Sequence, residues 1–135
     1  MNLPEEARSP IDKEELIRFT QKLVRCRSWN PPGDEAEVAA LVAEQMEAFG
    51  MEVRLSQAAP KRNNVYGRLR GRGKDKGVLL LVSHLDTVPP GNKERERDPL
   101  SGDISGGRLY GRGSADMKSG LAAILFAAGA LAGSG

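Results

Sequence analysis

Apolar residues recur at helical spacing near the start of the chain and predict an amphipathic helix. The apolar stripe consists of Leu16, Ile17, Thr20, Leu23 and Val24, and the charged Lys13, Glu14, Arg18 and Lys22 are expected to be exposed. Ser9 offers a capping side chain, Pro10 suits the first helical position and Asp12 is an acid three residues after the cap. We therefore expect a helix that begins at this point and ends near Cys26.

A second helix is predicted after a rigid turn. The turn is Ser28-Trp29-Asn30-Pro31-Pro32-Gly33, because two prolines and a glycine exclude a continuing helix. Asp34 with Glu37 is expected to open the next helix, which carries apolar or long side chains at spacings of three and four up to Phe49. Gly50 follows where a helix C-cap glycine belongs.

Alternating patterns after the second helix predict short strands. Residues 51–55 and 64–70 read as strands, with Asn63-Asn64 as the turn, and residues 104–110 read as a hairpin broken by Gly106-Gly107. The apolar run of residues 121–132 predicts a buried helix that starts near Met117 or Lys118. By itself this run is too short to span a bilayer.

Residues 78–86, Val-Leu-Leu-Leu-Val-Ser-His-Leu-Asp, combine an apolar run with two polar side chains at its end. Apolar residues on both faces predict a central strand covered on both sides. Side chains alternate along a strand, so His84 and Asp86 are expected on the same face, with the carboxylate close enough to touch the imidazole. A metal-ligating histidine is commonly held in this way.

Composition narrows the class of protein. The 135 residues fit one domain or part of a larger one, and a net charge of +2 gives no reason to expect nucleic acid or a membrane as partner. The single cysteine, Cys26, suits a reducing compartment and is expected to be a buried helix residue. Residues 1–10 lack the apolar core of a signal peptide, so we expect a cytoplasmic location.

Each polar candidate also has a simpler interpretation. His84 fits a hydrogen-bonded core histidine as well as a metal ligand, and Asp116 fits the N-cap of the following helix. The segment from Gly111 to Asp116 imitates a dinucleotide fingerprint, but Asp116 replaces its third glycine and its charge would face the pyrophosphate. The basic residues 68–76 offer only Tyr66 for stacking, so a solvated connection is favoured over RNA binding.

Two spaced motifs resemble a known enzyme family. They are His84-Leu85-Asp86-Thr87-Val88-Pro89 and the longer Tyr110-Gly111-Arg112-Gly113-Ser114-Ala115-Asp116-Met117-Lys118-Ser119-Gly120. They are similar to the dinuclear zinc hydrolases that include aminoacylase, acetylornithine deacetylase, succinyl-diaminopimelate desuccinylase and glutamate carboxypeptidase. Residues 28–35 and the helix that ends at Phe49-Gly50 also resemble the opening of this family. The resemblance therefore extends from about residue 11 onward.

The resemblance implies roles for three residues. His84 is expected to ligate one zinc, Asp86 to be the catalytic-site carboxylate that orients His84, and Asp116 to bridge two zinc ions, for which Co2+ or Mn2+ could substitute. The implied fold is the α/β three-layer αβα sandwich of the zinc exopeptidases, with the site at the carboxyl ends of the strands. The implied reaction is hydrolysis of an amide bond in an N-acyl amino acid or short peptide.

The resemblance also implies that the site is incomplete in these residues. Family members supply a Glu-Glu pair, a further acidic ligand and a second histidine downstream, whereas this sequence has one histidine and no glutamate after Asp116. We expect residues 1–135 to be the N-terminal part of a catalytic domain, without the rest of that domain or the family's dimerisation domain. The alternative is an inactive truncated product, or a module that needs a partner chain to complete the site.

Overall fold

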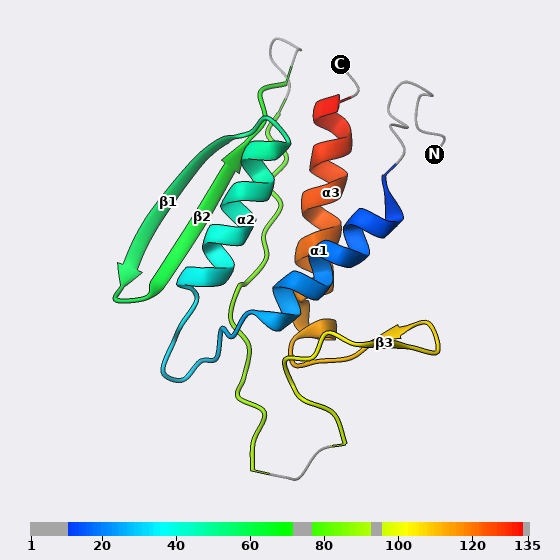
Figure 1. Ribbon diagram of the computed structural model, residues 1–135. Helices are drawn as coiled ribbons and strands as arrows, with labels where there is room; N and C mark the ends of the chain where they lie inside the picture. Colours follow the sequence, from blue (N-terminus) through cyan, green and yellow to red (C-terminus); the bar gives the residue numbers. More distant parts are fainter. Residues whose placement is uncertain (1–10, 72–76, 93–95, 134–135) are drawn as a thin grey trace.

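The computed structural model describes residues 11–71, 77–92 and 96–133. It contains helices and small antiparallel sheets in the order α1, α2, β1, β2, β3, β4, η2, α3 (Figure 1). This mixture is compatible with the predicted α/β class. The strands of the described residues form two separate two-stranded sheets, β1-β2 and β3-β4.

Helix α1 (Lys13–Arg25) begins later than predicted. Asp12 is its N-cap, and its carboxylate accepts hydrogen bonds from the backbone N–H groups of Glu14 and Glu15 at 2.9 and 3.0 Å. The expected cap at Ser9 and Pro10 lies outside the described residues. The buried stripe contains Phe19, which the pattern did not single out, whereas Ile17 is exposed.

Helix α2 (Ala36–Ala48) starts after two acidic residues that bind arginines. Asp34, the expected cap, instead pairs with Arg27 at 2.6 Å, and the buried Glu35 pairs with Arg62 through both carboxylate oxygens at 3.0 and 3.2 Å. The Glu35 pair joins the start of α2 to the following hairpin. Gly50 has φ of +73° directly after the C-cap, which confirms its predicted place.

Strands β1 (Glu52–Ala59) and β2 (Arg62–Arg68) form an antiparallel hairpin against which α2 packs (Figure 1). Asn63-Asn64 was predicted as its turn, which is wrong: both asparagines are paired within the ladder. The chain reverses at residues 60–61, where Lys61 has φ of +61°. Strand β1 therefore ends at Ala59 instead of residue 55, and β2 begins at Arg62 instead of residue 64.

The core lies between the helices. Leu23, Val38, Val42 and Ala122 are fully buried in it, and α1 packs beside α3 (Ser119–Gly133). The ring of Phe126 meets Phe19 at 5.8 Å and Phe49 at 5.1 Å between centroids. Three aromatic rings in contact fix the relative position of the helices better than aliphatic packing alone would.

Helix α3 is preceded by a tight hairpin and an irregular turn. Strands β3 (Ile104–Ser105) and β4 (Arg108–Leu109) confirm the predicted hairpin, which turns at Gly106-Gly107 with φ of +57° and +73°. The helical turn η2 (Ser114–Lys118) follows, and the regular helix begins at Ser119, slightly later than expected.

One helical stretch of the described residues, Ser114–Gly133, is long and apolar enough by length and composition to cross a membrane. The predicted apolar run of residues 121–132 is shorter than this stretch, which also includes η2 and therefore Asp116 and Lys118. A single stretch of this kind is weak support for a membrane span, since core helices of soluble proteins meet the same criterion. Leu121, Ala122, Leu125 and Phe126 form its buried face.

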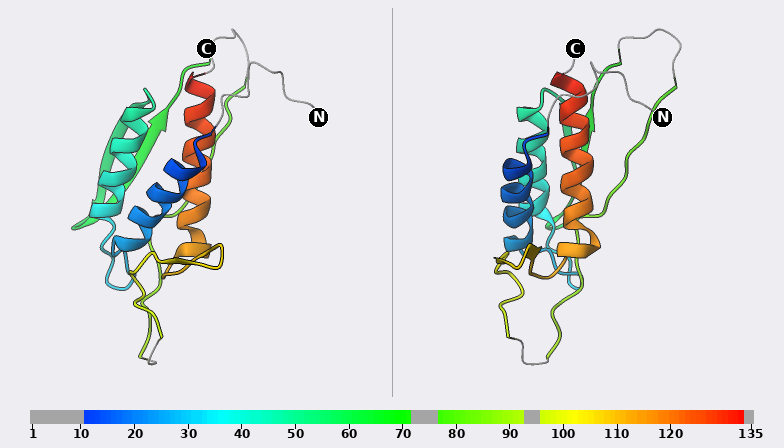
Figure 2. Two further views of the ribbon diagram at one scale, coloured as in Figure 1. Left: turned by 45° about the vertical axis from the view of Figure 1, so that its right-hand side comes forward. Right: turned by 90° about the vertical axis from the view of Figure 1, so that its right-hand side faces the viewer.

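The prediction of a central strand at residues 78–82 is wrong for this structure. These residues form no strand, and their side chains are between 46% and 95% exposed. Figure 2 shows the green segment after β2 standing apart from the helices. A strand requires a neighbour for its N–H and C=O groups, and no described segment pairs with this one. The three-layer sandwich consequently stays a prediction.

Candidate functional site

Two loops meet where the predicted polar residues lie. The backbone N–H of Asn30 donates to the carbonyl of Thr87 at 2.8 Å, and the N–H of Thr87 donates to the carbonyl of Ser28 at 2.8 Å. This short parallel bridge joins the Pro-rich turn after α1 to the residues that follow His84. It fixes His84 and Asp86 in the absence of the expected strand.

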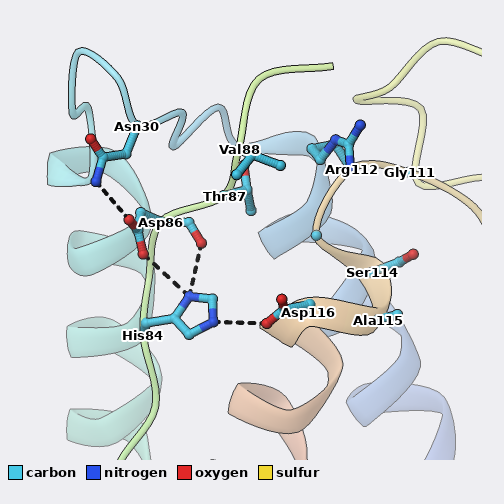
Figure 3. Close-up of a pocket in the computed structure, with 11 residues that line it drawn as sticks. Asn30, His84, Asp86, Thr87, Val88, Gly111, Arg112, Ser114, Ala115 and Asp116 are labelled. Atoms are coloured by element: carbon cyan, nitrogen blue, oxygen red, sulfur yellow. Dashed lines mark hydrogen bonds and ion pairs between the residues drawn. The ribbon is translucent and has the colours of Figure 1, made fainter. Parts of the chain in front are cut away.

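His84 lies between two aspartates (Figure 3). Its Nδ1 is 3.0 Å from the Asp86 backbone carbonyl and 3.2 Å from Asp86 Oδ1. Its Nε2 is 2.8 Å from Asp116 Oδ1. The predicted contact between Asp86 and the imidazole is therefore present, and the three residues named from the sequence meet at one place.

The surroundings of His84 favour its protonated form. Partial burial lowers the pKa of His84, but the hydrogen bond with Asp116, the carbonyl of Asp86 and the charges of both carboxylates together raise it above its ordinary value of 6.5. Each ring nitrogen has an acceptor, so a second proton is well accommodated. A metal ion that bound Nε2 would have to displace that proton.

Asp116 reaches His84 from the irregular turn before α3. Asp116 and Met117 have non-helical backbone angles, and the peptide bond between them is cis. The Asp116 side chain is 88% exposed and points at His84, as Figure 3 shows, so the interpretation of Asp116 as a simple helix cap does not describe its contacts. One carboxylate oxygen meets the imidazole, and the exposure leaves the other accessible.

Glycines allow this turn to approach its neighbours. Gly113 has φ of +84°, and a Cβ there would collide with Thr87 Cγ2. Gly111 has φ of +148°, and a Cβ there would collide with Val24 Cγ1. Glycine is needed at both positions, by conformation and by space, to bring Asp116 beside the loop of His84.

Lys118 anchors the same turn and was not identified from the sequence. It is 1% exposed, and its ammonium donates to the carbonyls of Leu23 and Cys26, at 2.7 and 2.6 Å, at the C-terminal end of α1. Burial lowers the pKa of Lys118 to about 8. The only signal in the sequence was a lysine at the start of an otherwise apolar helix, which does not reveal its partners.

Cys26 agrees with its prediction as a core residue. It is 7% exposed, and burial, with the nearby Glu37, raises the pKa of its thiol to about 11. A thiol with so high a pKa carries very little thiolate at neutral pH. Cys26 therefore contributes packing and a backbone carbonyl for Lys118 to this region.

A pocket of about 290 Å3 opens over the aspartates and His84. Its walls come from the Pro-rich turn, the segment after His84 and the glycine-rich turn, and the lining residues are Asn30, His84, Asp86, Thr87, Val88, Gly111, Arg112, Gly113, Ser114, Ala115 and Asp116. This volume lies near the lower limit of small-molecule sites. Every residue predicted for the site lines it.

Two side chains of types that can ligate a metal converge in the described residues. His84 Nε2 and Asp116 Oδ1 converge, while Asp86 engages the other ring nitrogen, as a residue that orients a ligating histidine does. Two ligands on one tetrahedral zinc lie about 3.3 Å apart, so the observed 2.8 Å would need to widen slightly. No group of three or more potential ligands is arranged around one point in the part of the chain described.

Comparison with protein families identifies the segment that carries this cluster. Residues 80–135 match the model of peptidase family M20/M25/M40. The match confirms the resemblance predicted from the sequence over this segment, and it indicates a metallopeptidase or related hydrolase. The M20 match contains His84, Asp86, Asp116 and Lys118, and the resemblance expected for residues 11–79 lies outside it.

Proposed function

We propose that this chain contributes to the active site of a zinc-dependent hydrolase that cleaves the amide bond of an N-acyl amino acid or a short peptide. The observation that carries the proposal is the placement of His84 between Asp86 on Nδ1 and Asp116 on Nε2. The M20 match to the same residues supports this reaction class.

The three side chains have distinct roles in this proposal. The Asp86 backbone carbonyl and carboxylate Oδ1 accept the Nδ1 proton of His84, so that the Nε2 lone pair faces the pocket. Asp116 contributes one oxygen beside Nε2 and keeps a second, exposed oxygen for another ion. Zinc bound by His84 and Asp116 would polarise the amide carbonyl and lower the pKa of a water molecule. Co2+ or Mn2+ are the proposed substitutes.

The proposal includes a metal site that residues 1–135 do not complete. A catalytic zinc usually has three protein ligands, and His84 and Asp116 are two. We propose that residues 1–135 are the N-terminal part of the catalytic domain of a cytoplasmic enzyme that dimerises through a separate domain. Residues 78–82 would then form a central strand of a three-layer sandwich. Their exposure of five consecutive apolar side chains supports a missing neighbour.

The competing proposal is a polypeptide without catalytic activity, or a module completed by a partner chain. Hydrolysis by the 135-residue chain tests what both readings share, which is a site with fewer protein ligands than a catalytic zinc requires. Purified protein should release no product from a panel of N-acyl amino acids and dipeptides in the presence of Zn2+. Zinc-dependent turnover that co-purifies with the 135-residue chain would contradict the incomplete site.

Zinc binding tests the ligand assignment directly. The wild-type chain should bind Zn2+ weakly, and His84→Ala and Asp116→Ala should each reduce the affinity by at least about tenfold, measured by competition with a chromophoric chelator. Glu44→Ala, an exposed acid on α2, is the matched control and should leave the affinity unchanged. Equal affinities in wild type and His84→Ala would sink the assignment.

A further inference from the structure

Asn30 contacts the cluster from a part of the chain far from it in sequence. Its side-chain Nδ2 donates to Asp86 Oδ2 at 2.9 Å, across 56 residues of sequence (Figure 3). We propose that Asn30 is a positioning residue that fixes the orientation of the Asp86 carboxylate and, through it, the tautomer of His84. The relevance of this role of Asn30 to metal binding rests on the proposed function.

The backbone around Asn30 is rigidly held. Its N–H donates to the carbonyl of Thr87, whose own N–H donates to the carbonyl of Ser28, both at 2.8 Å. Ser28 is fully buried and Thr87 is 6% exposed, so water does not compete with this bridge. Because Thr87 directly follows Asp86, the bridge sets the distance from the Asn30 amide to the carboxylate.

Hydrogen-bond chemistry assigns the two Asp86 oxygens to different partners. An ionised carboxylate only accepts, and an amide NH2 only donates, so Asn30 occupies Oδ2. The other oxygen, Oδ1, is then directed at His84 Nδ1, 3.2 Å away. Rotation about the terminal torsion of an aspartate is otherwise soft. Asn30 therefore restricts the torsion that determines whether a carboxylate oxygen of Asp86 faces the imidazole.

The two aspartates favour different tautomers of His84. The Asp86 backbone carbonyl at 3.0 Å and the Asp86 carboxylate Oδ1 at 3.2 Å both favour a proton on Nδ1, whereas Asp116 favours a proton on Nε2. A metal ion requires a bare Nε2, so any weakening of the Asp86 contact acts against metal binding. Asn30 thus stabilises the tautomer that a metal site needs, although it does not touch the imidazole itself.

Nuclear magnetic resonance of His84 tests the effect of Asn30 on the tautomer without any metal. The chain has one histidine, so its ring 15N signals are unambiguous, and at alkaline pH, where the ring is neutral, they report the tautomer ratio. Asn30→Leu has similar size but no donor and should shift the ratio toward Nε2–H by about threefold. Asn64→Leu, at an exposed position on β2, is the matched control and should leave the ratio unchanged.

A double-mutant cycle on Zn2+ affinity tests whether Asn30 acts through Asp86. Asn30→Leu should weaken Zn2+ binding by about tenfold in the wild type and should have no further effect in Asp86→Ala. Equal losses in both backgrounds, or an unchanged tautomer ratio, would overturn the proposal. If wild type binds no zinc, the proposed function fails, and the metal-free tautomer ratio still decides the role of Asn30.

Discussion

Replacing Lys118 by methionine tests how the turn that carries Asp116 is held. The substitution keeps the length and most of the volume of the side chain but removes its ammonium. Lys118 is 1% exposed, and it is the observed side-chain partner of the Leu23 and Cys26 carbonyls. Its loss leaves the Cys26 carbonyl without its observed hydrogen bond and leaves the Leu23 carbonyl with the one from the backbone N–H of Cys26, at a place that water reaches poorly.

Two opposing effects determine how much Lys118→Met changes the free energy of unfolding at neutral pH. The Cys26 carbonyl loses its observed donor, which costs about 1–3 kcal/mol, and the Leu23 carbonyl loses one of two hydrogen bonds, which costs about 1 kcal/mol, so these contacts favour the wild type by about 2–4 kcal/mol. Against this, the fall of the Lys118 pKa from 10.5 to about 8 means that its buried charge costs about 3 kcal/mol, at about 1.4 kcal/mol per tenfold change in proton affinity. We therefore expect Lys118→Met to change the free energy of unfolding by no more than about 1 kcal/mol near pH 7.

The difference in unfolding free energy between the wild type and Lys118→Met should shift in favour of the wild type as the pH rises. Between the folded pKa of about 8 and the unfolded value of 10.5, the unfolded chain binds more protons at Lys118, so the wild type gains stability with pH. From about pH 7 to about pH 9 the gain is about 1.3 kcal/mol. Cys26, whose pKa rises from 9.0 to about 11, acts in the opposite direction, but it is present in both proteins and cancels in the comparison.

The assay is urea denaturation of both proteins, followed by circular dichroism and Trp29 fluorescence at several pH values. The difference in unfolding free energy should increase by about 1.3 kcal/mol from about pH 7 to about pH 9. Lys22→Met, at an exposed position on α1, is the matched control and should show no such increase. A difference that does not change with pH would refute the buried-ammonium account.

Three further predictions follow from other contacts in the structure. Gly113→Ala should lower the free energy of unfolding by about 1–3 kcal/mol, because φ is +84° and the new Cβ has no room, whereas Gly106→Ala should cost less because its surroundings are open. Arg62→Ala leaves the buried Glu35 unpaired and should lower the free energy of unfolding by about 2–3 kcal/mol in chemical denaturation. The pKa of His84, measured by NMR titration, should lie above 6.5, so its contribution to stability is complete below that pH and is lost as the pH rises through the folded value.

Local rules predicted most of the helical structure. The helical spacing, the Pro-Pro-Gly turn and the C-cap glycine at Gly50 are properties of short segments, and the structure agrees with them to within a few residues. The starts of α1 and α2 were placed wrongly because several acids compete to cap a helix. Asp34 binds Arg27 instead, a contact that depends on how the turn between them folds.

Long-range partners explain what the sequence did not predict. A strand at residues 78–82 depends on neighbours that the pattern cannot supply, and Lys118 finds acceptors 92 and 95 residues earlier in the chain. The site was more accessible to prediction. The spacing of His84 and Asp86 predicted their contact, whereas the place of Asp116 in the site was expected only from the resemblance of its motif to the zinc hydrolases.

The most direct test of the metal site is the response of the His84 ring nitrogens to Zn2+. The chain is labelled with 15N and titrated with Zn2+, and only His84 contributes imidazole signals. We predict a large shift at Nε2, a proton retained on Nδ1, and loss of the response in Asp116→Ala. Ring signals that stay unchanged at saturating Zn2+ would contradict the assignment of His84 as a metal ligand.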